Sequence, residues 1–120
     1  MSGKELAFPK SCRLTQATEF DCVKQNGRVQ RGQLILLSVL ETSDTVGFRA
    51  GFVTSRAVGS AVVRNRIRRR LREIVRKHQR EIAGGNWIVT IARTPAAKAS
   101  YQELEVEWLR LAKRASILAA

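Results

Sequence analysis

The sequence has few of the residues with which proteins bind metal ions or hydrolyse bonds by themselves. Histidine occurs once, at His78, and cysteine twice, at Cys12 and Cys22, with no Cys-x-x-Cys motif. Neither Asp21 nor Asp44 belongs to a carboxylate motif, and no glycine-rich phosphate loop occurs. A nuclease acting through its own side chains would need clustered carboxylates or a histidine pair. The sequence therefore predicts no catalytic residue and no metal site, and it predicts that both cysteines are reduced.

Long apolar segments are also missing. No run approaches the 18 or so apolar residues of a membrane span. The first eleven residues, MSGKELAFPKS, lack the apolar centre of a signal peptide. We therefore expect no membrane partner and a cytoplasmic location.

Acidic residues are scarce relative to basic ones. The chain of 120 residues has 22 Lys and Arg against 10 Asp and Glu, for a net charge of +12. Hydrophobic residues make up 44%, which is typical of a folded domain and excludes a disordered polycation. A folded domain with this charge indicates a nucleic acid as partner, with an anionic membrane as the weaker alternative.

The basic residues concentrate in one stretch, residues 60–80. Nine of the 22 lie there, and Glu73 is its only acid. At helical spacing, apolar residues such as Ile67, Leu71 and Ile74 fall on one side, and most arginines fall on the other. The arginines repel one another, and a nearby polyanion would relieve that repulsion. The stretch therefore predicts an amphipathic helix, capped by Ser60, that packs on a core and binds nucleic acid.

The remaining elements follow from periodicity and turn residues. A basic arm is expected over residues 1–12, followed by a single RNA-binding domain over 13–120. A helix capped by Thr15 should end at Asn26-Gly27, and residues 33–40 and 46–55 read as an antiparallel hairpin. Residues 87–93 predict another strand, and the Ser100/Glu103 capping box predicts a last helix. The fold class is α+β, a small two-layer sandwich.

Two further groups of titratable residues have an ordinary structural interpretation. His78 lies on the apolar edge of the basic helix, where packing is expected rather than acid–base chemistry. Glu103, Glu105 and Glu107 suggest a solvated first helical turn that complements the helix dipole, in preference to a metal site.

The segment GFVTSRAVGSAVVRNRIRRRLRE, residues 51–73, resembles the signature of the bacterial ribonuclease P protein subunit family. Its most specific part is Arg64-Asn65-Arg66 with the preceding Gly59 and Ala61-Val62. Glu19-Phe20 before Asn26-Gly27-Arg28 is similar to the family's first helix. Residues 91–93 and 100–104 are similar to its last strand and helix, so the resemblance covers roughly residues 12–115.

This resemblance implies a fold and a function. The family's fold is an α/β sandwich with three helices and a four-stranded, mostly antiparallel sheet that includes a left-handed strand–helix–strand crossover. In the family, a catalytic RNA subunit with bound Mg²⁺ removes the 5′ leader of precursor tRNA. The protein binds both RNAs and is thus a subunit of an endoribonuclease. No organic cofactor and no DNA partner are implied.

Site residues follow by position in the family pattern. RNA contacts are implied or expected for one residue after the strand and eight on the basic helix: Arg56, Arg64, Asn65, Arg66, Arg68, Arg69, Arg70, Arg72 and Arg76. Phe20 matches an aromatic of the family's leader cleft, although a core role for Phe20 stays open. Lys24 and Leu37 stand where many members have further aromatics, so we expect the cleft to depend more on charge and less on stacking.

Three alternatives remain at this stage. A ribosomal or other RNA-binding protein of similar fold would share the charge but have no processing role. A DNA-binding repressor would need a short helix and turn before the basic helix, and none is predicted. A self-sufficient nuclease is disfavoured because clustered carboxylates are missing.

Overall fold

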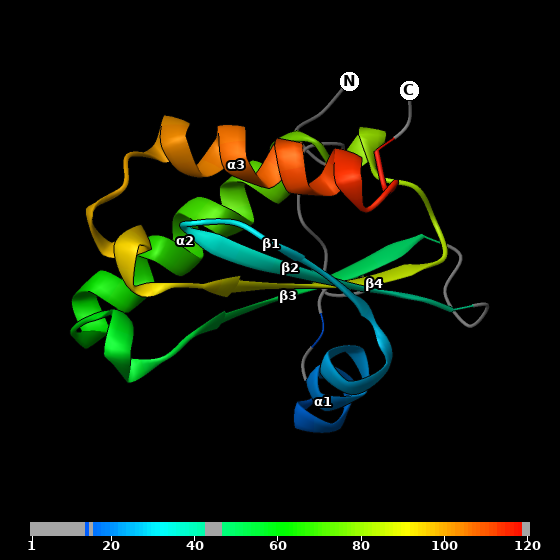
Figure 1. Ribbon diagram of the computed structural model, residues 1–120, viewed down its shortest axis with the longest axis horizontal. Coiled ribbons are helices and arrows are strands. Elements are labelled where there is room, and N and C mark those ends of the chain that lie inside the picture. The colour runs from blue at the N-terminus through cyan, green and yellow to red at the C-terminus, as the bar shows by residue number, and fades with distance from the viewer. Residues whose placement is uncertain (1–13, 15, 43–46, 119–120) are drawn as a thin grey trace, which may run out of the picture.

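The computed structural model describes residue 14, residues 16–42 and residues 47–118 (Figure 1). The elements run α1 (Ala17–Asn26), β1 (Arg28–Arg31), β2 (Ile35–Glu41), β3 (Phe48–Thr54), η3 (Arg56–Val58), α2 (Ala61–Lys77), η4 (Gln79–Glu81), β4 (Asn86–Ala92), η5 (Thr94–Lys98) and α3 (Tyr101–Arg114). The predicted arm, Thr15 and Cys12 lie outside the described residues. The α+β class with three α-helices and a four-stranded sheet is confirmed.

The strand order is β1-β2-β4-β3, and it overturns one prediction. Residues 33–40 and 46–55 do form strands, but they do not pair as a hairpin. β4 lies between them, antiparallel to β2 and parallel to β3. Every residue on one face of β4 is buried, and Val89 is buried on the other face, which favours a central position. No property of the turn residues reveals this. The hairpin is instead β1–β2, in which Arg31 pairs with Leu36.

Helix α2 connects the parallel neighbours β3 and β4. This is the strand–helix–strand crossover that the family resemblance implies. Two of the three strand pairings are antiparallel, as expected. The left-handed turn of the crossover stays a prediction.

The sheet separates two apolar clusters. Helices α2 and α3 cover one face, and α1 lies on the other (Figure 1). The larger cluster joins Ile67, Leu71 and Ile74 of α2 to Leu104 and Trp108 of α3, all fully buried. The buried Trp108 indole donates to Thr90 Oγ1 at 3.1 Å, so its polar group has a partner. The smaller cluster, under α1, contains Leu14, Val23 and Val89.

The sequence predicted the N-cap residue correctly for two of the three α-helices. Ser60 caps α2 by accepting from the Val63 amide, and Ser100 and Glu103 form the predicted capping box of α3. Helix α1 is instead capped by Gln16, whose backbone amide donates to Glu19 Oε1 at 3.0 Å. Gln16 is a less usual cap than threonine, so the sequence pointed to the neighbouring residue.

The expected solvated turn at Glu103, Glu105 and Glu107 is correct only for Glu103. Glu107 is buried, and its Oε2 accepts from the amides of Leu34 and Ile35 at 2.6 and 2.9 Å. A buried carboxylate is tolerated when hydrogen bonds satisfy it. Glu107 thereby fastens the β1–β2 turn to α3, a role that depends on a long-range contact.

His78 connects three elements and is more than a packing residue. Its ring lies 2.7 Å from a Glu81 oxygen through Nδ1 and 2.9 Å from a Glu105 oxygen through Nε2. Lys77 Nζ lies 3.0 Å from the same Glu105 oxygen. Burial lowers the pKa of His78, but hydrogen bonds to Glu81 and Glu105 outweigh it, so the pKa is raised above 6.5. The hydrogen bond from His78 lowers the pKa of Glu105, against the effect of burial.

The raised pKa of His78 predicts a pH-dependent stability. The charged His78 contributes to the free energy of unfolding. This contribution is complete below about pH 6.5, where the histidine is charged in both the folded and the unfolded protein, and it is lost as the pH rises through the pKa of the folded state. Urea unfolding at pH 6 and pH 8.5 should show a loss of about 1 kcal/mol. His78 is the only histidine, so His78→Gln should abolish most of this difference. An unchanged difference in His78→Gln would contradict the assignment.

Candidate nucleic-acid interface

The arginines of α2 divide into sets with different surroundings. Arg68 points towards β3, where its Nη1 donates to Thr54 Oγ1 at 3.1 Å. Its Nη2 donates to Asn65 Oδ1, so the asparagine of the Arg-Asn-Arg motif orients this guanidinium. Arg72, one turn further, lines a cavity together with Phe20. Arg68 and Arg72 therefore face the space between α1 and α2.

Arg66 and Arg70 have a different role. Arg66 Nη2 donates to the Ala97 carbonyl and Arg70 Nη1 to the Ala99 carbonyl, both at 3.0 Å. These carbonyls belong to η5 and the residue after it, which connect β4 to α3. Two of the predicted RNA-binding arginines thus hold a loop of the protein itself, a contact that sequence spacing does not reveal.

The other predicted contacts lie at the surface or near it. Asn65, Arg69 and Arg56 are exposed, and Arg64 is partly buried. Arg76 forms an ion pair with Glu73. Within the described part of the chain, the Nε atoms of Arg64 and Arg66 are buried without a hydrogen-bond partner. Two guanidinium N–H donors near the start of α2 are therefore without an acceptor in this part of the chain.

A groove runs between α1 and the edge strand β3, and we call it the α1–β3 groove. One part has a volume of about 100 Å³ and is lined by Leu14, Phe20, Ala50, Gly51, Phe52 and Arg72. The other has about 370 Å³ and is lined by Ala17, Phe20, Asp21, Lys24, Phe52, Val53, Thr54 and Arg68. Phe20 and Phe52 line both parts, so the groove joins two aromatic rings to the cations Lys24, Arg68 and Arg72.

Phe20 belongs to the groove and to the core at once. Its ring is partly buried and packs on the smaller apolar cluster. Phe52 is a groove residue that the sequence reasoning missed. The alternation of residues 46–55 indicated only that Phe52 shares one face of a strand with Phe48 and Ala50. Its side chain is accessible because β3 lies at the edge of the sheet.

The assignment of Leu37 to the leader cleft is not compatible with the structure. Leu37 is fully buried in the larger cluster, on the face of the sheet covered by α2 and α3. Its neighbour Leu36 pairs with Ile91, which packs on the α1 face. Because side chains alternate along a strand, an error of one residue places the side chain on the wrong face.

Gly51 explains how Phe20 lies so close to the sheet. A Cβ atom at Gly51 would come within 2.4 Å of two atoms of the Phe20 ring, which real contacts do not allow. A glycine in a strand interior costs stability, and here it creates the space that the ring occupies. Gly51 therefore sets the position of the Phe20 ring.

Fold and groove together define an α+β nucleic-acid-binding protein whose aromatic groove, flanked by cations, suits a single strand. The family model described as Ribonuclease P matches residues 8–116. The chain belongs to the ribonuclease P protein family, as the Arg-Asn-Arg segment predicted, and is thus a subunit of the endoribonuclease that processes tRNA.

Relatives and solved structures agree with this family. The ribonuclease P protein component of Acidothermus cellulolyticus is 46% identical over 109 residues, covering 89% of this chain and 90% of the relative. That of Syntrophomonas wolfei is 32% identical, covering 92% of each. A Staphylococcus aureus RNase P protein structure matches with a TM-score of 0.85 at 25% identity, covering 91% of this chain and 99% of the other. The Thermotoga maritima protein matches with a TM-score of 0.77 at 25% identity, covering 85% and 96%.

The division among the arginines predicts separable effects. Arg66→Gln and Arg70→Gln should each lower the free energy of unfolding by about 1–2 kcal/mol, because a carbonyl loses a charged donor. Arg69→Gln, next to Arg70 but exposed, should leave stability within about 0.5 kcal/mol of the parent. Urea unfolding measures all three. Equal stability of Arg69→Gln and Arg70→Gln would contradict a structural role for Arg70.

The contact between Gly51 and Phe20 predicts a coupled pair. Gly51→Ala should destabilise the protein by about 1–3 kcal/mol through overpacking, and the cost should fall sharply when Phe20 is already alanine. Gly47→Ala is the matched control, because a Cβ there meets no atom within 4 Å. A double-mutant cycle by urea unfolding measures the coupling. Additive effects would show that the two residues do not constrain each other.

Proposed function

We propose that the arginine face of α2 binds the catalytic RNA subunit and that the α1–β3 groove holds the 5′ leader of precursor tRNA. Family membership supports an RNA complex, and the chemistry of each surface supports the assignment. Exposed arginines bind phosphates without reading sequence, whereas aromatic rings between cations suit unpaired bases. The proposal places both surfaces in one cytoplasmic ribonucleoprotein.

The reaction itself belongs to the RNA subunit in this proposal. Among the described residues, no group of three or more His, Cys, Asp or Glu is arranged to hold a metal ion. We therefore assign the Mg²⁺ ions of the reaction to the RNA. The protein contributes cations that screen phosphate repulsion, so less Mg²⁺ is needed to bring the two RNAs together. No helix in the described part of the chain is long and apolar enough to cross a membrane.

The position of Phe20 is the observation that carries the proposal. Its ring lines both parts of the groove, and Arg68 and Arg72 each line one of them. A base that stacks on Phe20 would therefore keep its phosphates near guanidinium groups. The structure also supplies Phe52 as a second aromatic ring, which offsets the lysine at position 24.

Phe20→Ala tests the leader assignment in the complex with the RNA subunit. Affinity for precursor tRNA should fall about tenfold, because a stacked base contributes about 1–3 kcal/mol. Affinity for mature tRNA should change little, because mature tRNA has no leader. Binding of both tRNAs is measured by filter retention or fluorescence, at one stated salt concentration.

A matched aromatic truncation serves as control. Tyr101→Ala removes a partly buried ring on the opposite side of the sheet, so it should leave the ratio of the two affinities unchanged. An equal loss for both tRNAs in a folded Phe20→Ala protein would show that Phe20 is a core residue and that the leader lies elsewhere. Cleavage of precursor tRNA by the RNA-free protein would overturn the proposed division of labour.

A further inference from the structure

The α1–β3 groove contains a carboxylate among its cations. Asp21 lies next to Phe20 on α1 and lines the larger part of the groove, together with Lys24 and Arg68. Among the described residues that line the two parts of the groove, Asp21 is the only acid. A carboxylate at this place repels the phosphates of any RNA strand in the groove. General attraction of RNA therefore does not explain why an acid lies there.

The local structure does not explain Asp21 either. It is the fifth residue of α1, so it lies beyond the first turn, where the helix dipole would stabilise a negative charge. Aspartate also has a low helix propensity at such an interior position. Within the part of the chain that the structure describes, the exposed Asp21 forms no hydrogen bond and no ion pair. Its carboxylate is therefore available to a ligand in the groove.

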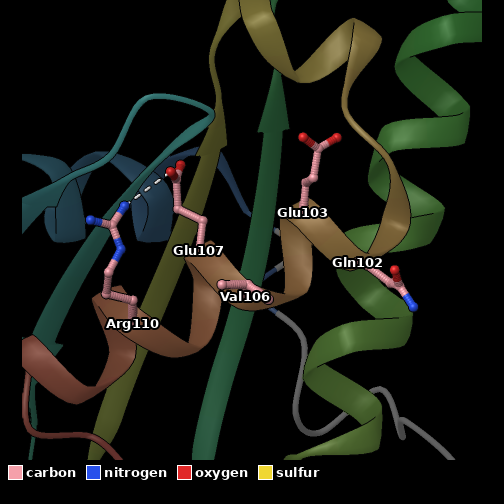
Figure 2. A pocket seen from close by; sticks show the side chains of 5 residues that line it. All are labelled: Gln102, Glu103, Val106, Glu107 and Arg110. Atoms are coloured by element: carbon pink, nitrogen blue, oxygen red, sulfur yellow. Dashed lines mark hydrogen bonds and ion pairs between the residues drawn. The ribbon is translucent and has the colours of Figure 1, made fainter.

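The acids of another hollow differ from Asp21 in this respect. A hollow of about 360 Å³ on α3 is lined by residues that include Glu103 and Glu107 (Figure 2). Glu107 accepts from two backbone amides and forms an ion pair with Arg110, which Figure 2 shows. Glu103 completes the capping box of α3. Both carboxylates are thus used within the protein, whereas that of Asp21 is not.

An unpaired RNA strand offers a carboxylate two kinds of donor, the 2′-hydroxyl groups and the N–H groups of the bases. Asp21 neighbours Phe20, on which a base would stack, so the edge of that base is the nearer kind. Guanine presents two adjacent donors, N1–H and the N2 amine. Adenine and cytosine present one amine beside an acceptor nitrogen, and uracil presents one N–H between two carbonyl oxygens. The two oxygens of a carboxylate therefore match guanine better than any other base.

Arg68 supplies the complementary contact from α2. Its Nη1 donates to Thr54 and its Nη2 to Asn65, which holds the guanidinium in place and leaves further donors for a ligand. Arginine commonly donates two hydrogen bonds to O6 and N7 of guanine. Guanine is thus the base that offers paired donors to a carboxylate and paired acceptors to a guanidinium. Asp21 and Arg68 line the same part of the groove.

We propose that Asp21 makes the α1–β3 groove selective for guanine at one position of the leader. The inference rests on the proposed function, which places the leader in this groove. The guanine stacks on Phe20, donates through N1–H and the N2 amine to Asp21, and accepts from Arg68 through O6 and N7. Repulsion between Asp21 and the phosphates weakens the binding of every leader, whereas these hydrogen bonds form with guanine alone. Asp21 therefore discriminates against the other bases as well as for guanine.

Precursor tRNAs with a single guanine at successive positions of an otherwise uridine leader test the proposal in the complex with the RNA subunit. Affinity relative to mature tRNA, at one stated salt concentration, should rise about tenfold at one position, as expected for a bidentate base contact. Inosine, which lacks the N2 amine, should bind several-fold more weakly than guanine at that position. Asp21→Asn keeps the shape of the side chain and should remove both preferences.

Glu41→Gln is the matched control. Glu41 is exposed on β2, lies outside both parts of the groove and forms a surface ion pair with Arg28 at 3.5 Å. Its replacement removes the same charge as Asp21→Asn, so it should keep the preference for guanine. Because Asp21 is exposed, Asp21→Asn should fold like the parent.

Three results would overturn the role of Asp21: a guanine preference that persists in Asp21→Asn, a preference for another base, or an equal change for every leader. An equal change would show that the carboxylate acts on the sugar–phosphate backbone. If any of these results accompanies tighter binding of precursor than of mature tRNA, the leader groove of the proposed function stands. Equal binding of precursor and mature tRNA by the parent complex would contradict the leader groove and this inference together.

Discussion

Burial of one side of α2 determines where the charge of this protein lies. Ile67, Leu71, Ile74 and Val75 are fully buried against the sheet and α3, so the helix has a single allowed rotation. With that side fixed, the arginines must occupy the remaining circumference. Some of them face the α1–β3 groove, and others face η5. The electrostatic surface is therefore a consequence of apolar packing.

The same constraint gives arginines in one motif different tasks. Arg68 is held by Thr54 and Asn65 at the groove, whereas Arg66 and Arg70 bond to carbonyls of the β4–α3 connection. A guanidinium has five donors in a rigid plane, so it can satisfy a backbone carbonyl and still present charge at the surface. The basic helix is thus part of the scaffold as well as the surface that we propose binds RNA. A count of the basic residues in α2 therefore overstates how many of them serve RNA binding alone.

The groove depends on a small residue as much as on large ones. Gly51 allows the Phe20 ring to lie against β3, and the edge position of β3 keeps Phe52 accessible. Cations from α1 and α2 then line the same space. Three elements that are separate in the sequence thereby form one site. On the far side of the sheet, Leu104, Trp108 and Leu111 of α3 are fully buried in the larger cluster.

Local patterns determined the amphipathic helix with its Ser60 cap, the capping box at Ser100, the segments of β2, β3 and β4, and the Arg-Asn-Arg motif that indicated the family. They did not locate the short strand β1. The features that they did determine depend on residues within a turn or two of each other, so periodicity and capping chemistry are sufficient to find them. Only the tertiary structure decided the position of β4 between β2 and β3, the burial of Leu37 instead of Leu36, and the roles of Glu105, Glu107, Arg66 and Arg70. Each of these depends on a partner distant in sequence. Alternation and charge show that a side chain needs a partner, but they do not show which element provides it.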